Sequence, residues 1–262
     1  NTTYKGSDVI VCVIDSGIDY THEDFRGLTD PSQSRILYIW DQTLSTQGSE
    51  ETPSQRSTDT DLSGFNYGVE YTNSDIENDL SGQSIVRQAD TDGHGTHVTG
   101  TAAGNGGAHP DEKYKGMAPK ADIITVKAGN ASFQFSNVID GMNYCGEVAE
   151  NQSKPVVVNM SLGASSGPHD GTSTQDVAVD NFVSSSSGRS VVIAAGNSGA
   201  SGMHTSSTVS SNSSVSFDIN VPSSVSSGEF RADTWLSNSN DATVEIETPS
   251  GTTVGPLTPS DA

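Results

Sequence analysis

The sequence contains, at residues 9–17, the stretch Val9-Ile10-Val11-Cys12-Val13-Ile14-Asp15-Ser16-Gly17, in which six apolar side chains are followed by a polar turn. A run this short, and apolar at every position, suits a strand that is covered on both faces, as in a parallel sheet. We therefore predict a buried strand over residues 8–14 that delivers Asp15 to the carboxyl end of a sheet.

The same pattern of short apolar runs continues along the chain. Further short apolar runs occur at 35–40, 121–127, 155–160 and 190–195. Helical patterns lie between them, at 93–103, 135–150 and 174–185. Alternation of strands and helices predicts an α/β domain with a mainly parallel sheet flanked by helices. The polar, turn-rich stretch 41–90 is expected to be a surface excursion.

The character of the sequence changes after Asn197. Residues 198–214 are rich in Ser, Gly and Thr, as in a linker. Apolar residues then alternate with polar ones, at Val215, Phe217, Ile219 and Val221 and again at Val244 and Ile246. Period-two alternation with turn signals predicts half-buried antiparallel strands, as in a β-sandwich. We expect one domain over 1–204 and part of a β-sandwich over 205–262.

The formal net charge of −21 limits the partners of the protein. A strongly negative field repels nucleic acid and anionic membranes, so neither is expected to bind. No apolar run approaches the length of about eighteen residues that a membrane helix needs. The acidic residues are interpreted as a solubilising surface, and some of them as ligands of structural Ca²⁺, although no loop spacing locates a calcium site.

The two cysteines, Cys12 and Cys145, lie in apolar contexts. Cys12 belongs to the first strand, and Cys145 follows the helical pattern of 135–150. We interpret both as small buried apolar residues in preference to a disulfide, which is the alternative.

Three polar positions stand at the ends of predicted elements. Asp15 ends the first strand, Asn197 follows the last strand, and His94 opens the small-residue helix. Ligands of open α/β sheets bind at the carboxyl ends of the strands, so these side chains are candidates for chemistry. A zinc motif would place two histidines four apart with a Glu between them, whereas His94 and His97 are three apart with Gly and Thr between. One working base and one structural histidine are therefore favoured over a metal site.

The combination of blocks resembles the subtilisin-like serine peptidases, or subtilases. The blocks occur in the order of that family over roughly residues 4–200. They are Asp15-Ser16-Gly17-Ile18-Asp19, Gly93-His94-Gly95-Thr96-His97-Val98-Thr99-Gly100, Met117-Ala118-Pro119-Lys120-Ala121, Asn159-Met160-Ser161-Leu162-Gly163 and Ala194-Ala195-Gly196-Asn197-Ser198-Gly199.

The resemblance implies a role for each block. Asp15 would orient His94, His94 would act as the general base and acid, and Asn197 would donate to the oxyanion. Chemistry of this kind needs no cofactor. The backbone of a peptide or protein substrate would be held on two sides, and the residues implied are Ser161, Leu162, Gly163, Ala128, Gly129, Asn130, Ala195 and Gly196.

The nucleophilic serine is the part of the pattern that the chain lacks. In the family it follows the asparagine, within a block that resembles Gly-Thr-Ser-Met-Ala-x-Pro. The Gly171-Thr172-Ser173 of this chain precedes Asn197 instead, and Ser173 is interpreted as the N-cap of the helix that follows. Some bacterial subtilases, including those that resemble the clostridial spore-germination enzymes, insert a jelly-roll-like β-sandwich before the serine. We therefore expect the serine beyond Ala262, in sequence lost from this chain or in a separate complementary polypeptide.

The resemblance predicts a secreted bacterial serine endopeptidase, with a signal and a pro-segment that are not in this chain. The chain alone is expected to be inactive. A pseudopeptidase that binds a peptide or regulates a partner without cleavage is the alternative, and a carbohydrate-binding role of the sandwich is a third reading that rests on fold analogy alone.

Overall fold

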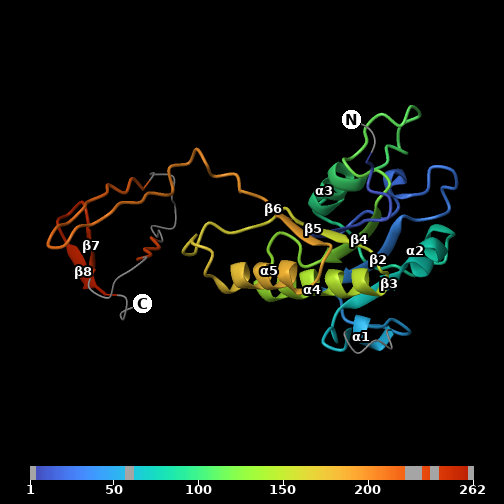
Figure 1. Cartoon of the computed structure of the whole chain (residues 1–262), viewed down its shortest axis with the longest axis horizontal. Helices are drawn as coiled ribbons and strands as arrows, with labels where there is room; N and C mark the ends of the chain where they lie inside the picture. The colour runs from blue at the N-terminus through green and yellow to red at the C-terminus, as the bar shows by residue number, and fades with distance from the viewer. Residues whose placement is uncertain (1–3, 57–61, 222–231, 237–241, 259–262) are drawn as a thin grey trace. The chain divides into compact units, whose positions relative to one another are not determined.

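The computed structural model describes residues 4–56, 62–221, 232–236 and 242–258. These residues divide into two compact units. The first comprises Asn1–Gly163 and Thr174–Ala195, and the second comprises Ala164–Ser173 and Gly196–Ala262. Each unit is treated separately below (Figure 1).

The first unit is built on a six-stranded sheet with the order β3-β2-β4-β1-β5-β6. Every neighbouring pair is parallel except β2 and β3. The mainly parallel sheet predicted from the apolar runs is thus confirmed. The strands are β1 (Ile10–Asp15), β2 (Ile36–Asp41), β3 (Val69–Thr72), β4 (Asp122–Lys127), β5 (Val156–Met160) and β6 (Arg189–Ile193).

Helices cover both faces of this sheet. In Figure 1, α4 and α5 lie against one side of the sheet and α3 lies on the other. Alternation along β1 divides the core in the same way: Cys12 and Ile14 belong to the cluster that includes α4, whereas Val11 and Val13 belong to the cluster on the opposite face. The helical elements of the unit are η1 (Glu23–Phe25), α1 (Pro53–Arg56), α2 (Asn73–Leu80), α3 (His94–Ala103), α4 (Phe135–Asn151) and α5 (Thr174–Ser185).

The prediction that 41–90 is a surface excursion is wrong in part. The segment contains β3, which extends the sheet by antiparallel pairing with β2, and the helix α2. Val69, Tyr71 and Ile76 are buried in the core. Their apolar side chains are too widely spaced among polar residues to form a recognisable pattern, and it is the pairing with β2 that makes Val69–Thr72 a strand.

The interpretation of the cysteines as unpaired is also wrong. Cys12 and Cys145 form a disulfide, with their Cα atoms 6.3 Å apart. Cys12 lies on the face of β1 that α4 covers, and the packing of α4 brings Cys145 over it. The two positions are separated by 133 residues, so only the tertiary structure reveals that they meet.

The second unit contains a two-stranded antiparallel sheet of β7 (Val244–Glu247) and β8 (Thr253–Leu257). The strand predicted at 244–248 is confirmed, but residues 215–221 form no strand, and their alternating apolar side chains Val215, Phe217, Ile219 and Val221 are exposed. A period-two pattern forms a strand only where a neighbouring strand accepts its hydrogen bonds. The limits 1–204 and 205–262, and the sandwich itself, stay predictions.

Candidate active site

Asp15 and His94 are in direct contact in the first unit. Asp15 is the last residue of β1 and is fully buried, and His94 is the first residue of α3 and keeps half of its side chain exposed. The His94 Nδ1 and Asp15 Oδ1 atoms lie 2.8 Å apart. With Asp15 ionised, Nδ1–H donates to the carboxylate, which leaves Nε2 as the free acceptor of the ring.

The surroundings of His94 favour its protonated form. The hydrogen bond to Asp15, together with the charges of Asp15, Asp92 and Asp90, raises the pKa of His94 above its ordinary value. A base with a raised pKa accepts a proton more readily, which is what a general base near neutral pH requires.

The carboxylate of Asp15 is held through one of its two oxygens. Its Oδ1 atom also accepts from the Ser16 backbone N–H at 2.7 Å. Its Oδ2 atom is buried and has no hydrogen-bond partner among the described residues. On the neighbouring strand, the register partner of Asp15 is Lys127, the last residue of β4. Lys127 is nearly fully buried and donates to the carbonyl of Ala89.

Two glycines let β1 and α3 approach closely enough for this contact. A Cβ added at Gly95 would lie 2.2 Å from the Gly17 carbonyl oxygen and 3.2 Å from the Asp15 Cβ. No side chain fits in that space, so close packing requires a glycine at position 95, the second glycine of the Gly-His-Gly sequence at the start of α3.

The residues predicted to hold a substrate follow the ends of β4 and β5, the two strands that flank β1. Ala128 and Gly129 are buried just after β4, and Asn130 is exposed. After β5, Ser161 and Leu162 are half-buried and Gly163 is exposed. The Asn159 amide donates to Ser161 Oγ at 3.1 Å, and the Leu162 side chain packs on the core. The structure places these segments at the carboxyl edge of the sheet, where β1 delivers Asp15.

The remaining predicted residues follow β6. Ala195 is the last residue of the first unit, and Gly196 and Asn197 begin the second. All three are exposed. The part of Asn197 in oxyanion binding therefore stays a prediction.

Ser173 immediately precedes α5, which begins at Thr174. That position agrees with an N-cap. Ser173 belongs to the second unit, whereas Asp15 and His94 belong to the first.

A metal site is not evident within the described ranges, where no group of three or more His, Cys, Asp or Glu side chains is arranged to hold an ion. The Nδ1 atom of His94 is already engaged by Asp15. None of the helices formed by the described residues is long and apolar enough to cross a membrane.

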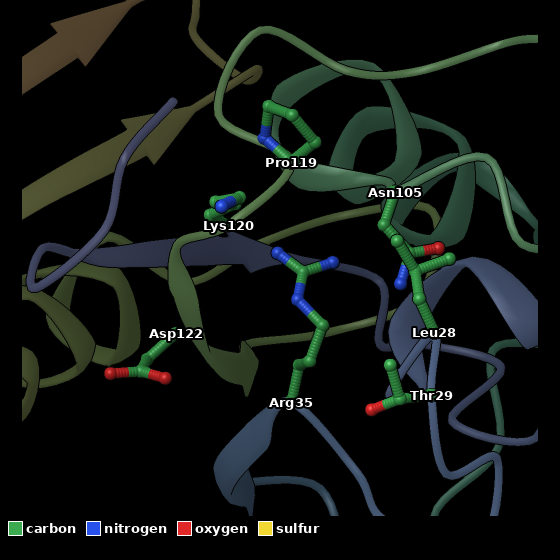
Figure 2. Close-up of a pocket in the computed structure, with 7 residues that line it drawn as sticks. All are labelled: Leu28, Thr29, Arg35, Asn105, Pro119, Lys120 and Asp122. Atoms are coloured by element: carbon green, nitrogen blue, oxygen red, sulfur yellow. The ribbon is translucent and has the colours of Figure 1, made fainter. Parts of the chain in front are cut away.

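A cavity of about 260 Å³ lies elsewhere, near the start of β2 and β4 (Figure 2). Arg35 points into the middle of its lining residues. Its guanidinium donates to the backbone carbonyls of Asp24, Ala103 and Ala121, and burial lowers its pKa to about 10. The guanidinium thus ties three chain segments together, and we assign it a structural role.

Sequence reasoning missed Asp90, which contacts both the segment that follows Asp15 and the start of α3, where His94 lies. Its carboxylate accepts from Ser16 Oγ at 2.8 Å and from the Thr96 backbone N–H at 2.8 Å. A signal was available, because an acidic residue just before a helix N-terminus is a common capping pattern. From the sequence, Asp90 is instead only the last residue of the polar stretch 41–90 that is predicted to be a surface excursion.

A buried carboxylate that orients a half-exposed imidazole, at the carboxyl edge of a parallel α/β sheet, is the arrangement that the acid and base of a hydrolase triad require. Comparison with known proteins agrees with that class. A sequence model described as the Subtilase family matches residues 6–253. The chain belongs to the subtilase family of serine peptidases.

Individual relatives match the same region. The PI-type proteinase of Lactococcus lactis subsp. cremoris is 33% identical over 210 residues, which is 78% of this chain and 10% of the proteinase. Subtilisin amylosacchariticus of Bacillus subtilis subsp. amylosacchariticus is 29% identical over 246 residues, which is 93% of this chain and 46% of that protein. Among solved structures, the CspB protease of Clostridium perfringens superposes with a TM-score of 0.62 at 30% identity, over 77% of this chain and 39% of that one. The chain thus spans less than half the length of these relatives.

Proposed function

We propose that the protein containing this chain is a secreted serine endopeptidase that cleaves peptide bonds with a triad of Asp15, His94 and a serine. The observation that carries the proposal is the 2.8 Å contact between Asp15 and His94, with the acid fully buried and the base half exposed. His94 Nε2 takes the proton of the serine hydroxyl as Oγ attacks the substrate carbonyl, and later delivers it to the leaving amine.

The nucleophile in this proposal lies outside residues 1–262, and the chain alone does not cleave peptides. The single Gly-Thr-Ser of the chain precedes Asn197, opposite to the order of the family blocks. The exposure of β6 is a second support. This strand ends the six-stranded sheet, yet Val192 and Ile193 are about half exposed. Strands of parallel sheets normally have other elements packed on both faces. A serine-bearing segment packed against β6 would cover these side chains.

In the proposed complex, the Asn197 amide donates to the developing oxyanion. An extended peptide pairs with the backbone on one side at Ser161 to Gly163 and on the other at Ala128 to Asn130. The space beside Gly163 suits a close approach, because a Cβ there would meet no atom within 4 Å. Secretion is supported by the Cys12–Cys145 disulfide, a bond that persists in oxidising compartments. Structural Ca²⁺ and a complementary polypeptide that carries the serine are further parts of the proposal.

The test uses the complete gene product that contains residues 1–262. A fluorophosphonate should label one serine, and mass spectrometry of the peptides should place it outside these residues. Casein hydrolysis should fall by about 10⁴-fold or more in Asp15→Asn and in His94→Ala. The 262-residue chain should show neither labelling nor hydrolysis.

The same measurements separate the alternatives. A complete protein that binds peptide but is never labelled would be a pseudopeptidase, and the proposal would be wrong. Labelling at Ser173 would show that the nucleophile has been misplaced. A His97→Ala variant is the matched control, since His97 lies on the same helix, and it should keep hydrolysis within a few-fold of the parent.

A further inference from the structure

The carboxylate of Asp90 receives four hydrogen bonds. Oδ1 accepts from the Gly93 backbone N–H at 3.0 Å and from Ser16 Oγ at 2.8 Å. Oδ2 accepts from the Thr96 backbone N–H at 2.8 Å and from Thr96 Oγ1 at 2.6 Å. Although burial alone would raise the pKa of Asp90, the hydrogen bonds from Thr96, Ser16 and Gly93 lower it, so the group is ionised at neutral pH.

These bonds connect the two segments that carry the acid and the base. Ser16 is the residue after Asp15, and Gly93 and Thr96 stand on either side of His94. Ser16 also bonds α3 directly, because its Oγ atom accepts from the Gly95 backbone N–H at 3.0 Å. A second link runs from the Asp19 backbone N–H to Thr96 Oγ1 at 2.8 Å. The end of β1 and the start of α3 are thus held in one register.

Asp90 also accepts hydrogen bonds from the backbone at the N-terminus of α3. The N-cap residue of this helix is Gly93, which has no side chain to accept from the first turn. The backbone N–H groups at a helix N-terminus need acceptors, and a negative charge there is favoured by the helix dipole. Asp90 supplies both from three residues upstream. No hydrogen bond joins Asp90 to the His94 ring in the described structure, so any effect of Asp90 on the position of the ring passes through the backbone.

We propose that Asp90 is a positioning residue for His94, holding the imidazole at hydrogen-bond distance from Asp15 by fixing the start of α3 to Ser16. This proposal rests on the proposed function for its catalytic consequence. Its structural part, the geometry of the Asp15–His94 pair, can be measured on the 262-residue chain in the absence of the nucleophilic serine.

The first experiment follows the His94 Nδ1–H proton by NMR, at a pH where the imidazole is protonated. A proton held between an imidazolium and a carboxylate resonates at unusually low field. Asp90→Asn should abolish or strongly broaden this resonance, because the Asn amide would face the Thr96 N–H as a second donor. Asp92→Asn is the matched control. Asp92 is exposed and also raises the pKa of His94 by its charge, but its side chain makes no hydrogen bond to α3 in the described structure.

The control separates charge from position. The carboxylates that act on His94 are Asp15 at the end of β1, and Asp92 and Asp90 in the loop before α3. Both Asn variants remove a charge and should lower the pKa of His94, but only Asp90→Asn should lose the low-field resonance. Retention of that resonance in Asp90→Asn, or its loss in Asp92→Asn, would overturn the proposal. Ser16→Ala cuts the link to β1, and with it the acceptor of the Gly95 N–H, while leaving the bonds from Gly93 and Thr96 to Asp90 intact. It should weaken the resonance, and it replaces Asp90→Asn if that variant fails to fold.

The second experiment measures peptide hydrolysis by the complete protein. Asp90→Asn should lower kcat by about 10- to 100-fold with little change in KM, as expected when a catalytic group is displaced by a fraction of an ångström. Asp92→Asn should keep its plateau kcat within about two-fold and shift the acidic limb of the pH profile downwards. Equal kcat in Asp90→Asn and the parent would overturn the proposal. A parent protein without hydrolysis would refute the proposed function, while the NMR result would still decide the role of Asp90.

Discussion

At the level of single residues, the contact between Gly95 and Gly17 determines how close α3 can come to β1. Replacing Gly95 with Ala would place a methyl group 2.2 Å from the Gly17 carbonyl oxygen, so the start of α3 must move away. We expect Gly95→Ala to lower the melting temperature and to remove the Asp15–His94 hydrogen bond. Overpacking of this kind costs about 1–3 kcal/mol of unfolding free energy.

Gly100→Ala is the matched control for this prediction. It lies in the same helix, and an added Cβ would meet nothing within 4 Å. The change should be neutral or stabilise by up to about 1 kcal/mol, because Ala is the better helix former. Thermal unfolding followed by circular dichroism, with the NMR resonance of His94, distinguishes the two variants. Similar behaviour of both variants would contradict the packing described here.

The titration of His94 is a second prediction at this scale. Its folded-state pKa is raised, so it gains protons on folding and adds stability that is fully present below its unfolded pKa. That stability is lost as pH rises through the folded pKa, which is also where the neutral base becomes available for catalysis. Hydrolysis by the complete protein should therefore rise with pH through a midpoint above 6.5, the ordinary value of histidine. Asp15→Asn should lower the His94 midpoint in an NMR titration of the chain, and an unchanged midpoint would contradict the assignment.

Sequence reasoning singled out Asp15 and His94, which the structure brings into contact, because both are polar residues at the ends of predicted elements. The bonds of Asp90 to Gly93 and Thr96 are local, but its link to the end of β1 spans 74 positions, from Ser16 to Asp90, and is not visible in the sequence. The same physical reason explains the disulfide. The apolar neighbours of Cys12 and Cys145 indicate burial, but burial does not show which partner packs opposite.

At the level of elements, a buried hydrogen bond connects β3 to α4. Tyr144, on α4, is fully buried and donates to Glu70 Oε1, on β3, at 2.6 Å. Burial raises the pKa of Glu70, and the Tyr144 hydrogen bond and Arg56 lower it in part. The carboxylate of Glu70 thus depends on few partners to remain ionised inside the protein.

Tyr144→Phe should therefore destabilise the fold by about 1–3 kcal/mol, the cost of leaving a buried acceptor without its donor. Because the folded pKa of Glu70 is raised, its ionisation destabilises the fold at pH values above its unfolded pKa, and losing the donor adds to that effect. Urea unfolding at two pH values, one near 4.5, the ordinary pKa of glutamate, and one well above it, should show the larger destabilisation at the higher pH. Adding Glu70→Gln should remove most of this pH dependence. A loss of stability that is equal at both pH values would argue against an ionised Glu70.

The prediction of elements was most accurate where the strand is a short run of consecutive apolar residues. Five such runs became β1, β2, β4, β5 and β6, although the side chains of β6 are partly exposed. β3 was missed, since half of its residues are polar and its identity depends on β2. The alternating stretch 215–221 was wrongly predicted as a strand for the converse reason: its pattern is suitable, but no neighbouring strand pairs with it in the described structure.

At the level of the whole molecule, the net charge of −21 sets a large self-repulsion. Like charges on a compact surface destabilise the folded state, and salt screens them over about 10 Å at 0.1 M ionic strength. We expect the melting temperature of the chain to rise by several degrees between 0.01 M and 0.5 M NaCl at pH 7. Differential scanning calorimetry measures the shift, and the same series at pH 4.3, the isoelectric point calculated from the sequence, should show a much smaller effect. A falling melting temperature at pH 7 would mean that attractive ion pairs outweigh the repulsion.

The exposed side of β6 has a consequence for the handling of the protein. Val192 and Ile193 present apolar surface next to backbone groups at the end of the sheet. A strand of this kind is a template on which another copy can pair, and long-range repulsion between acidic molecules is what keeps copies apart. Salt should therefore act in two directions on the purified chain, making each molecule harder to unfold while shortening the time for which a concentrated solution stays clear.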